Sequence, residues 1–242
     1  MQPIIAGHRG AAGIAPENTL ASFRKAVELG VRLIELDVRL TRDAQLVCFH
    51  DDRLDRVTAS RGPVAEWEWA ALAEVVVLPG AFHDAYPGAR IPLLAEVLAG
   101  LPTDCRFLVE LKAEPVRPEL LVERTLAEID AAGVGERCRI ISFDFELLRL
   151  ARRSSLDLGV LVATRDAAQL FHRARELGAR AVHPPYNLVN PSLVAEARDG
   201  GFLLNTWTVN TADDFRRLAV LGVDEITTDY PDQALNWAAA IR

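Results

Sequence analysis

The chain has 242 residues, half of them hydrophobic and a quarter charged, with a formal net charge of −7. This composition excludes an intrinsically disordered chain, and the acidic balance disfavours nucleic-acid binding, which needs a basic surface. No apolar run approaches the roughly 18 residues of a membrane span, and the start of the chain lacks a secretory leader. The three widely spaced cysteines, Cys48, Cys105 and Cys138, indicate thiols in the reducing cytoplasm rather than a disulfide framework.

Short apolar runs alternate with amphipathic helical stretches along the chain. The predicted strands are 3–7, 33–38, 106–112, 138–142, 158–162, 180–183, 202–206 and 224–228. The predicted helices are 18–29, 93–100, 118–132, 144–153, 166–177, 191–200, 211–221 and 231–240. Strands joined by helical crossovers are parallel, and eight such units predict an α/β fold, the TIM (β/α)8 barrel. An open doubly wound sheet is the alternative, but no glycine-rich dinucleotide fingerprint supports it.

The interval between the second and third predicted strands is far longer than the others. It begins with an additional strand, 45–50, whose short connection requires an antiparallel hairpin. We interpret 51–92 as an insertion on the top face of the barrel, anchored by Trp67 and Trp69. This segment has few apolar residues, so we expect no core of its own there. The prediction is a single domain, 1–242, that contains this insertion.

Carboxylates stand at the ends of two predicted strands. Glu35 and Asp37 share one face of the second strand, while the apolar residues between them share the other. Glu110 and Lys112 repeat this pattern on the third strand. Because the apolar faces must pack against helices, the charged side chains point into the barrel, where they repel and lose hydration unless a cation compensates. Three carboxylates suit Mg²⁺ or Ca²⁺ rather than zinc; a structural ion-pair cluster is the alternative.

Two histidines and two cations fall on the same predicted rim. His8 and Arg9 end the first strand, and His50 ends the additional strand. Histidine is the side chain best suited to exchange protons near neutral pH, whereas arginine and lysine bind phosphate oxygens. Lys112 is one of only two lysines among the 27 basic residues, which indicates that arginine would not serve in its place.

An ordered set of motifs spans nearly the whole chain. They are His8-Arg9-Gly10, Pro16-Glu17-Asn18-Thr19, Glu35-Leu36-Asp37, His50-Asp51, Glu110-Leu111-Lys112, Trp207-Thr208-Val209-Asn210 and Thr228-Asp229-Tyr230-Pro231. In these motifs the chain resembles the glycerophosphodiester phosphodiesterase family, in its bacterial cytosolic type. The resemblance implies a TIM barrel with a small insertion after the second strand.

The same resemblance implies roles for individual residues. Glu35, Asp37 and Glu110 would bind one divalent cation, His8 and His50 would act as acid and base, and Arg9 and Lys112 would hold the phosphate. We assign His8 as the base and His50 as the acid, although the sequence leaves these two roles open. It also leaves open the attacking group, either water or the substrate's own 2-hydroxyl, the choice of metal, the headgroup and the oligomeric state.

The expected activity is metal-dependent hydrolysis of small glycerophosphodiesters to glycerol 3-phosphate and an alcohol, a step of lipid and glycerol metabolism. One alternative is lysophospholipase D-type hydrolysis of a lipid phosphodiester, for which we find no amphipathic anchor. A non-catalytic phosphate-binding barrel is the other, and it would be expected to lack one of the histidines or carboxylates.

Several further residues carry weaker signals. Trp207 follows the seventh strand and either packs on a glycerol backbone or belongs to the core. Glu17 either supports the metal site or stabilises the first helix, and His183 is a candidate pocket residue. We expect Asp229 to support the last turn of the barrel rather than the chemistry, and His83 and His172 to be structural.

Overall fold

The fold of this chain is a closed barrel. A computed structural model describes residues 2–78, 85–113, 117–163 and 167–241, so His83 lies outside the described residues. The strands are β1 (Ile4–Gly7), β2 (Leu33–Leu40), β3 (Leu46–Cys48), β4 (Arg106–Leu111), β5 (Cys138–Ser142), β6 (Asp157–Leu161), β7 (Ala181–His183), β8 (Leu203–Thr206) and β9 (Glu225–Thr228).

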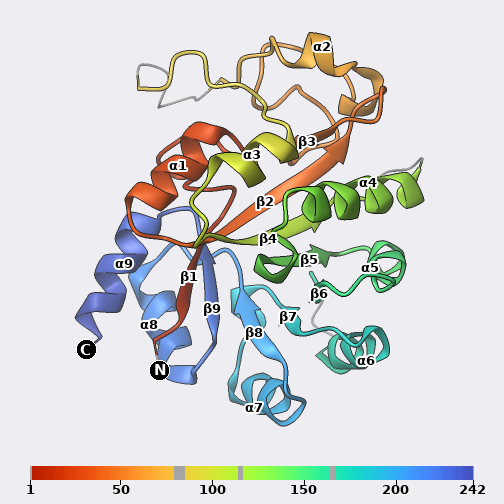
Figure 1. The fold of residues 1–242 in the computed structure, drawn as a ribbon. Helices are drawn as coiled ribbons and strands as arrows, with labels where there is room; N and C mark the ends of the chain where they lie inside the picture. The colour runs from red at the N-terminus through yellow and green to blue at the C-terminus, as the bar shows by residue number, and fades with distance from the viewer. Residues whose placement is uncertain (1, 79–84, 114–116, 164–166, 242) are drawn as a thin grey trace.

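The sheet runs in the order β1-β9-β8-β7-β6-β5-β4-β2-β3 (Figure 1). An additional pairing of β1 with β2 closes the ring, with Ala6 beside Leu33. Every pairing within the ring is parallel, while β3 pairs antiparallel with the end of β2. The predicted (β/α)8 barrel and the predicted hairpin are therefore confirmed.

Helices surround this ring. They are α1 (Leu20–Glu28), α2 (Trp69–Leu72), α3 (Leu94–Gly100), α4 (Pro118–Ala131), α5 (Phe145–Ala151), α6 (Ala167–Leu177), α7 (Pro191–Asp199), α8 (Ala212–Leu221) and α9 (Pro231–Ala240). Their apolar faces pack against the outer faces of the strands, and the side chains of Phe23, Phe107, Phe171 and Phe215 are fully buried there. No helix in the described ranges is long and apolar enough to cross a membrane.

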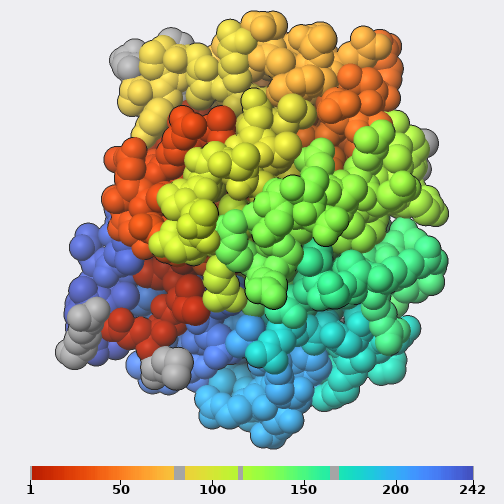
Figure 2. Space-filling model, viewed as in Figure 1, coloured from red at the N-terminus to blue at the C-terminus, as the bar shows by residue number. Residues whose placement is uncertain are grey.

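The segment between β3 and α3 forms a cap beside the end of β2. Figure 2 shows it in orange and yellow along one edge of the molecule. The expectation that it lacks a core of its own is wrong, because apolar residues of the segment, among them Leu54 and Leu72, pack with Val47 and Phe49 in a cluster separate from the barrel core. Trp67 and Trp69 pack against this cluster, as predicted for anchors of the segment.

The inside of the barrel contains a buried ion pair that sequence reasoning missed. The guanidinium of Arg139 on β5 donates to both carboxylate oxygens of Glu225 on β9, at 2.7 and 3.2 Å. Asn205 also donates to Glu225, and Thr227 donates to Asn205. These hydrogen bonds offset the cost of burying the two charges, although the buried Nε of Arg139 has no hydrogen-bond partner among the described residues. The network forms a polar layer inside the ring of strands.

Candidate active site

A tight turn at the end of β1 presents His8 and Arg9 to the pocket. Gly10 has a φ of +88°, and a Cβ atom there would lie 2.6 Å from Oγ of Ser22. Only glycine therefore fits between this turn and α1. The backbone N–H of Arg9 donates to Glu35 at 2.8 Å, which connects the turn to β2.

The three predicted metal ligands come together on β2 and β4. Asp37 and Glu110 are direct partners in the parallel register, and Glu35 lies two residues earlier on β2. All three are buried, and one oxygen from each lies within 4.8 Å of the others. Neighbouring carboxylates in this position form a compact, oxygen-only set of donors of the kind that a hard divalent cation prefers.

The carboxyl groups do not share their negative charge equally. Burial, followed by the charge of Asp37, raises the pKa of Glu35 to about 7 and that of Glu110 to about 8. Burial acts on Asp37 in the same direction, but Lys112 and Arg9 outweigh it and hold the pKa of Asp37 well below its usual value. A cation bound to the three groups would relieve this repulsion.

Both predicted phosphate-binding cations contact the carboxylates in this structure. The ammonium of Lys112 lies 2.5 Å from Glu110 and 2.8 Å from Asp37. The guanidinium of Arg9 lies 2.8 Å from Glu17 and 3.2 Å from Asp37. The two cations therefore border the carboxylate cluster and also line the pocket above it.

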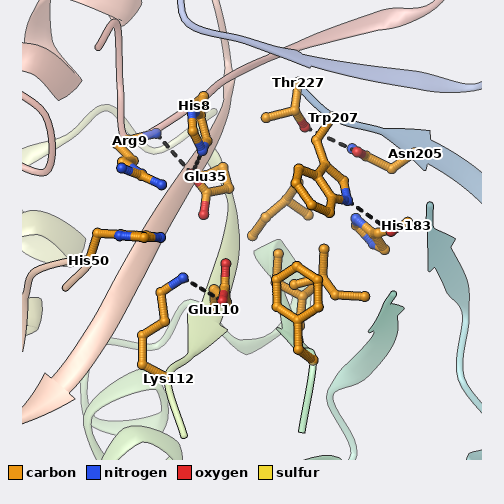
Figure 3. Close-up of a pocket in the computed structure, with 14 residues that line it drawn as sticks. His8, Arg9, Glu35, His50, Glu110, Lys112, His183, Asn205, Trp207 and Thr227 are labelled. Atoms are coloured by element: carbon orange, nitrogen blue, oxygen red, sulfur yellow. Dashed lines mark hydrogen bonds and ion pairs between the residues drawn. The ribbon is translucent and has the colours of Figure 1, made fainter. Parts of the chain in front are cut away.

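Two histidines of the pocket, His8 and His50, are each held by an aspartate. Nδ1 of His8 lies 2.6 Å from Asp229, and Nδ1 of His50 lies 2.7 Å from Asp51. In Figure 3 both rings point into the pocket, and Nε2 of His8 lies 4.0 Å from Glu35. An aspartate on Nδ1 fixes the ring and leaves Nε2 for proton transfer.

The two rings differ in their protonation. Burial lowers the pKa of His8, but the hydrogen bond to Asp229 and the charge of Glu35 outweigh it, and the pKa is raised. Burial dominates for His50, whose pKa is lowered. His8 therefore holds its proton to higher pH than His50 does.

The opposite side of the pocket is largely uncharged (Figure 3). Leu108, Ile141 and Leu161 form an apolar patch against which Trp207 packs. The indole N–H of Trp207 donates to the backbone carbonyl of His183 at 2.9 Å. Phe143 meets Trp207 edge to face, with ring centroids 5.4 Å apart, and is 43% exposed. His183 lines the pocket, and burial together with the charge of Arg139 lowers its pKa to about 3.

Sequence reasoning missed or misjudged several of these residues. Asp229 supports a turn through Asn210, as expected, but it also binds His8, which sequence reasoning did not predict. Glu17 neither contacts the carboxylate cluster nor caps α1; it pairs with Arg9 and Arg56. The His50-Asp51 pair was visible as a motif, but nothing in the sequence indicated that the two side chains contact each other.

Comparisons with known proteins agree with this geometry. A family model described as the glycerophosphoryl diester phosphodiesterase family matches residues 8–233. A glycerophosphodiester phosphodiesterase of Caldanaerobacter subterraneus subsp. tengcongensis is 36% identical to the chain, over 98% of each protein.

Two solved structures share the fold over nearly their whole length. A phosphodiesterase of Oleispira antarctica, solved in complex with the product sn-glycerol-3-phosphate, has a TM-score of 0.89 at 25% identity, and 98% of this chain and 97% of that chain align. A glycerophosphodiester phosphodiesterase of Agrobacterium tumefaciens has a TM-score of 0.83 at 26% identity, and 99% of this chain and 100% of that chain align.

Proposed function

Since the chain belongs to the glycerophosphoryl diester phosphodiesterase family, we propose that it hydrolyses glycerophosphodiesters to glycerol 3-phosphate and an alcohol with a divalent cation. The observation that carries this proposal is the buried set of Glu35, Asp37 and Glu110 beside two histidines that are each held by an aspartate. The set offers charge for a cation, and the histidines offer groups for two proton transfers.

The donor set fits the implied cation. Glu35, Asp37 and Glu110 would hold Mg²⁺ or Ca²⁺, because these ions prefer carboxylate oxygen. Burial and the charge of Asp37 raise the pKa values of the other two carboxyl groups, and a cation held by the set would favour their ionised forms. When bound, the cation supplies Lewis-acid polarisation of the phosphoryl oxygens and lowers the pKa of the attacking hydroxyl, from water or from the substrate.

The basic side chains would bind the phosphate. Arg9 offers a planar fork of donors for two phosphate oxygens, and Lys112 offers a compact charge in the same pocket. Both groups are already held by carboxylates, so little side-chain entropy is lost when the substrate binds. Trp207 would cover the glycerol or alcohol portion from the uncharged side of the pocket.

The histidines would carry the protons. One takes a proton from the attacking hydroxyl, and the other protonates the leaving alcohol. We propose His8 as the base and His50 as the acid. The pKa directions favour the reverse order, but Glu35 contributes to the raised pKa of His8 and is itself a proposed metal ligand. A leaving-group experiment, described in the Discussion, assigns the two roles.

Two further parts of the proposal concern organisation and location. We propose that residues 1–242 act as one catalytic domain with 51–92 as an insertion on the top face of the barrel. The three cysteines are buried free thiols, and this supports a reducing compartment, the cytoplasm.

A coupled assay of glycerol 3-phosphate release from glycerophosphocholine tests the proposal. We expect release in the presence of Mg²⁺ or Ca²⁺ and none after treatment with a chelator. Lysophosphatidylcholine in a parallel reaction, followed by the release of choline, separates the small-substrate activity from a lipid phosphodiesterase activity that would leave lysophosphatidic acid. Chelator-resistant release of glycerol 3-phosphate would contradict the role of the cation, and choline release from the lipid but not from glycerophosphocholine would contradict the substrate class.

A further inference from the structure

Arg56 lies in the segment after β3 and connects two parts of the site that the strands do not connect. Its Nε donates to Asp51 at 2.5 Å, and its two terminal nitrogens donate to the carboxylate of Glu17 at 2.8 and 2.7 Å. Asp51 holds Nδ1 of His50, and Glu17 accepts from Arg9 at 2.8 Å. One guanidinium therefore connects Asp51, which holds His50, with Glu17, which holds Arg9.

We propose that Arg56 is a positioning residue for the reaction, which orients His50 through Asp51 and Arg9 through Glu17. This inference rests on the proposed function, because His50 and Arg9 are the proposed proton-transfer and phosphate-binding groups. Arg56 itself does not line the pocket among the described residues, so its effect passes through the two carboxylates.

The geometry requires a guanidinium at this position. Glu17 and Asp51 lie on different loops, and Arg56 reaches both with three separate N–H groups in one plane. Bidentate pairing to Glu17 fixes the orientation of that carboxylate, and the remaining Nε–H restrains Asp51. A lysine at this position would present a single ammonium and could not hold both carboxylates in fixed directions.

Loss of Arg56 would affect Asp51 and Glu17 in different ways. Asp51 would keep its negative charge beside His50 without a balancing cation, and its carboxylate would lose one of the hydrogen bonds that fix its direction. Glu17, now paired only with Arg9, would compete with phosphate for that guanidinium. The first change affects proton transfer and therefore kcat, whereas the second affects substrate binding and therefore KM.

The test compares Arg56→Gln and Arg56→Ala with Arg53→Gln. Arg53 is a matched control because it lies in the same segment, is similarly exposed and pairs with another aspartate, Asp55, at 3.3 Å. We expect both Arg56 variants to lower kcat roughly 10–100-fold, a part of the effect of a positioned acid–base group, and to raise KM. Arg53→Gln should behave as the unaltered protein does.

Chemical rescue separates positioning from a merely structural role. Guanidinium ion, at a concentration that does not unfold the protein, should restore activity to Arg56→Ala, because it can refill the space between Glu17 and Asp51. Arg56→Lys should recover little. If guanidinium fails to rescue a correctly folded Arg56→Ala, or if the Arg56 variants match the Arg53 control, the proposal is overturned.

An NMR titration of His50 tests the link through Asp51 without an activity measurement. In Arg56→Gln the uncompensated charge of Asp51 should raise the pKa of His50 above its value in the unaltered protein and in Arg53→Gln. Asp37, Lys112 and Arg9 also act on His50, but none of them is altered in these variants. A protein that cleaves no glycerophosphodiester would overturn the proposed function, while an unchanged His50 titration would overturn the link through Arg56.

Discussion

Asp37 and Glu110 lie side by side on β2 and β4 and both contact the ammonium of Lys112. The pKa values of their carboxyl groups are nevertheless shifted in opposite directions. The pKa of Asp37 lies far below its usual value, and that of Glu110 is raised to about 8. Asp37 also forms an ion pair with Arg9 at 3.2 Å and accepts a hydrogen bond from the side-chain amide of Asn18 at 2.7 Å. The negative charge of the cluster is therefore concentrated on Asp37, and its neighbours hold protons up to near neutral pH.

This distribution predicts how stability depends on pH. The pKa values of Glu35 and Glu110 rise from 4.5 in the unfolded chain to about 7 and about 8 in the fold. The folded chain then binds more protons than the unfolded chain, so the free energy of unfolding falls as pH rises from 6.5 to about 8. His50 and His183, whose pKa values are lowered from 6.5, act in the opposite direction as pH rises through 6.5, so they offset part of the decline at the lower end of that window.

Urea unfolding in the presence of a chelator measures this effect. The decline between pH 6.5 and 8 should be smaller in Glu110→Gln, which has no carboxyl group to titrate at that position. Added Mg²⁺ or Ca²⁺ should stabilise the unaltered protein more at pH 8 than at pH 6.5, because cation binding no longer has to displace protons. Equal stabilisation at both pH values would contradict the titration of these ligands.

Removal of one carboxylate should weaken cation binding and activity together. We expect Glu35→Gln to reduce the affinity for Mg²⁺ or Ca²⁺, measured by isothermal titration calorimetry, by at least about tenfold, or about 1.4 kcal/mol. Glu28→Gln is the control, because Glu28 is an exposed glutamate on α1 that pairs only with Lys25 among the described residues. If Glu35→Gln stays active after chelation and dialysis, the metal assignment is wrong.

Single substitutions of the histidines should lower kcat by roughly 10²–10⁴-fold each, and the double variant should be little worse than the poorer single one. A substrate with a nitrophenol leaving group needs no proton on departure, so it should rescue the variant that lacks the acid. We expect rescue of His50→Ala. Rescue of His8→Ala would reverse the roles, and rescue of neither would mean that neither histidine protonates the leaving group.

Replacement of Lys112 by arginine should not preserve function. The ammonium fits between Asp37 and Glu110, and a longer, planar guanidinium could not contact both in the same space. We expect Lys112→Arg to lower kcat/KM at least about tenfold, which corresponds to about 1.4 kcal/mol of transition-state stabilisation. Steady-state kinetics that match the unaltered enzyme would remove the reason for lysine at this position.

The buried pair of Arg139 and Glu225 predicts a large effect on stability. Arg139→Met leaves the charge of Glu225 without its cation inside the barrel, which should cost about 3–5 kcal/mol of the free energy of unfolding. The double variant with Glu225→Gln should recover much of this loss. Arg149→Met, which removes the exposed pair with Glu146, should leave the chemical denaturation midpoint almost unchanged.

Local pattern was enough to place the carboxylates of the site. Side chains alternate along a strand with a period of two, so the apolar residues around Glu35, Asp37 and Glu110 already decided which face each carboxylate occupies. The order of strands and crossovers then predicted the barrel, and the ends of its parallel strands brought His8 and Arg9 to the same rim. These features depend on neighbours in sequence, and they were predicted correctly.

The partners of these groups depend on contacts between distant parts of the chain. Asp229 reaches His8 only because β9 closes the ring beside β1, across 221 residues. Arg56 reaches Glu17 only because the segment after β3 returns to the rim. Such contacts depend on the closure of the sheet and on the path of an irregular segment. Neither of these leaves a periodic pattern of residues in the sequence. The sequence thus determined which side chains face the pocket, and the tertiary structure decided what holds them there.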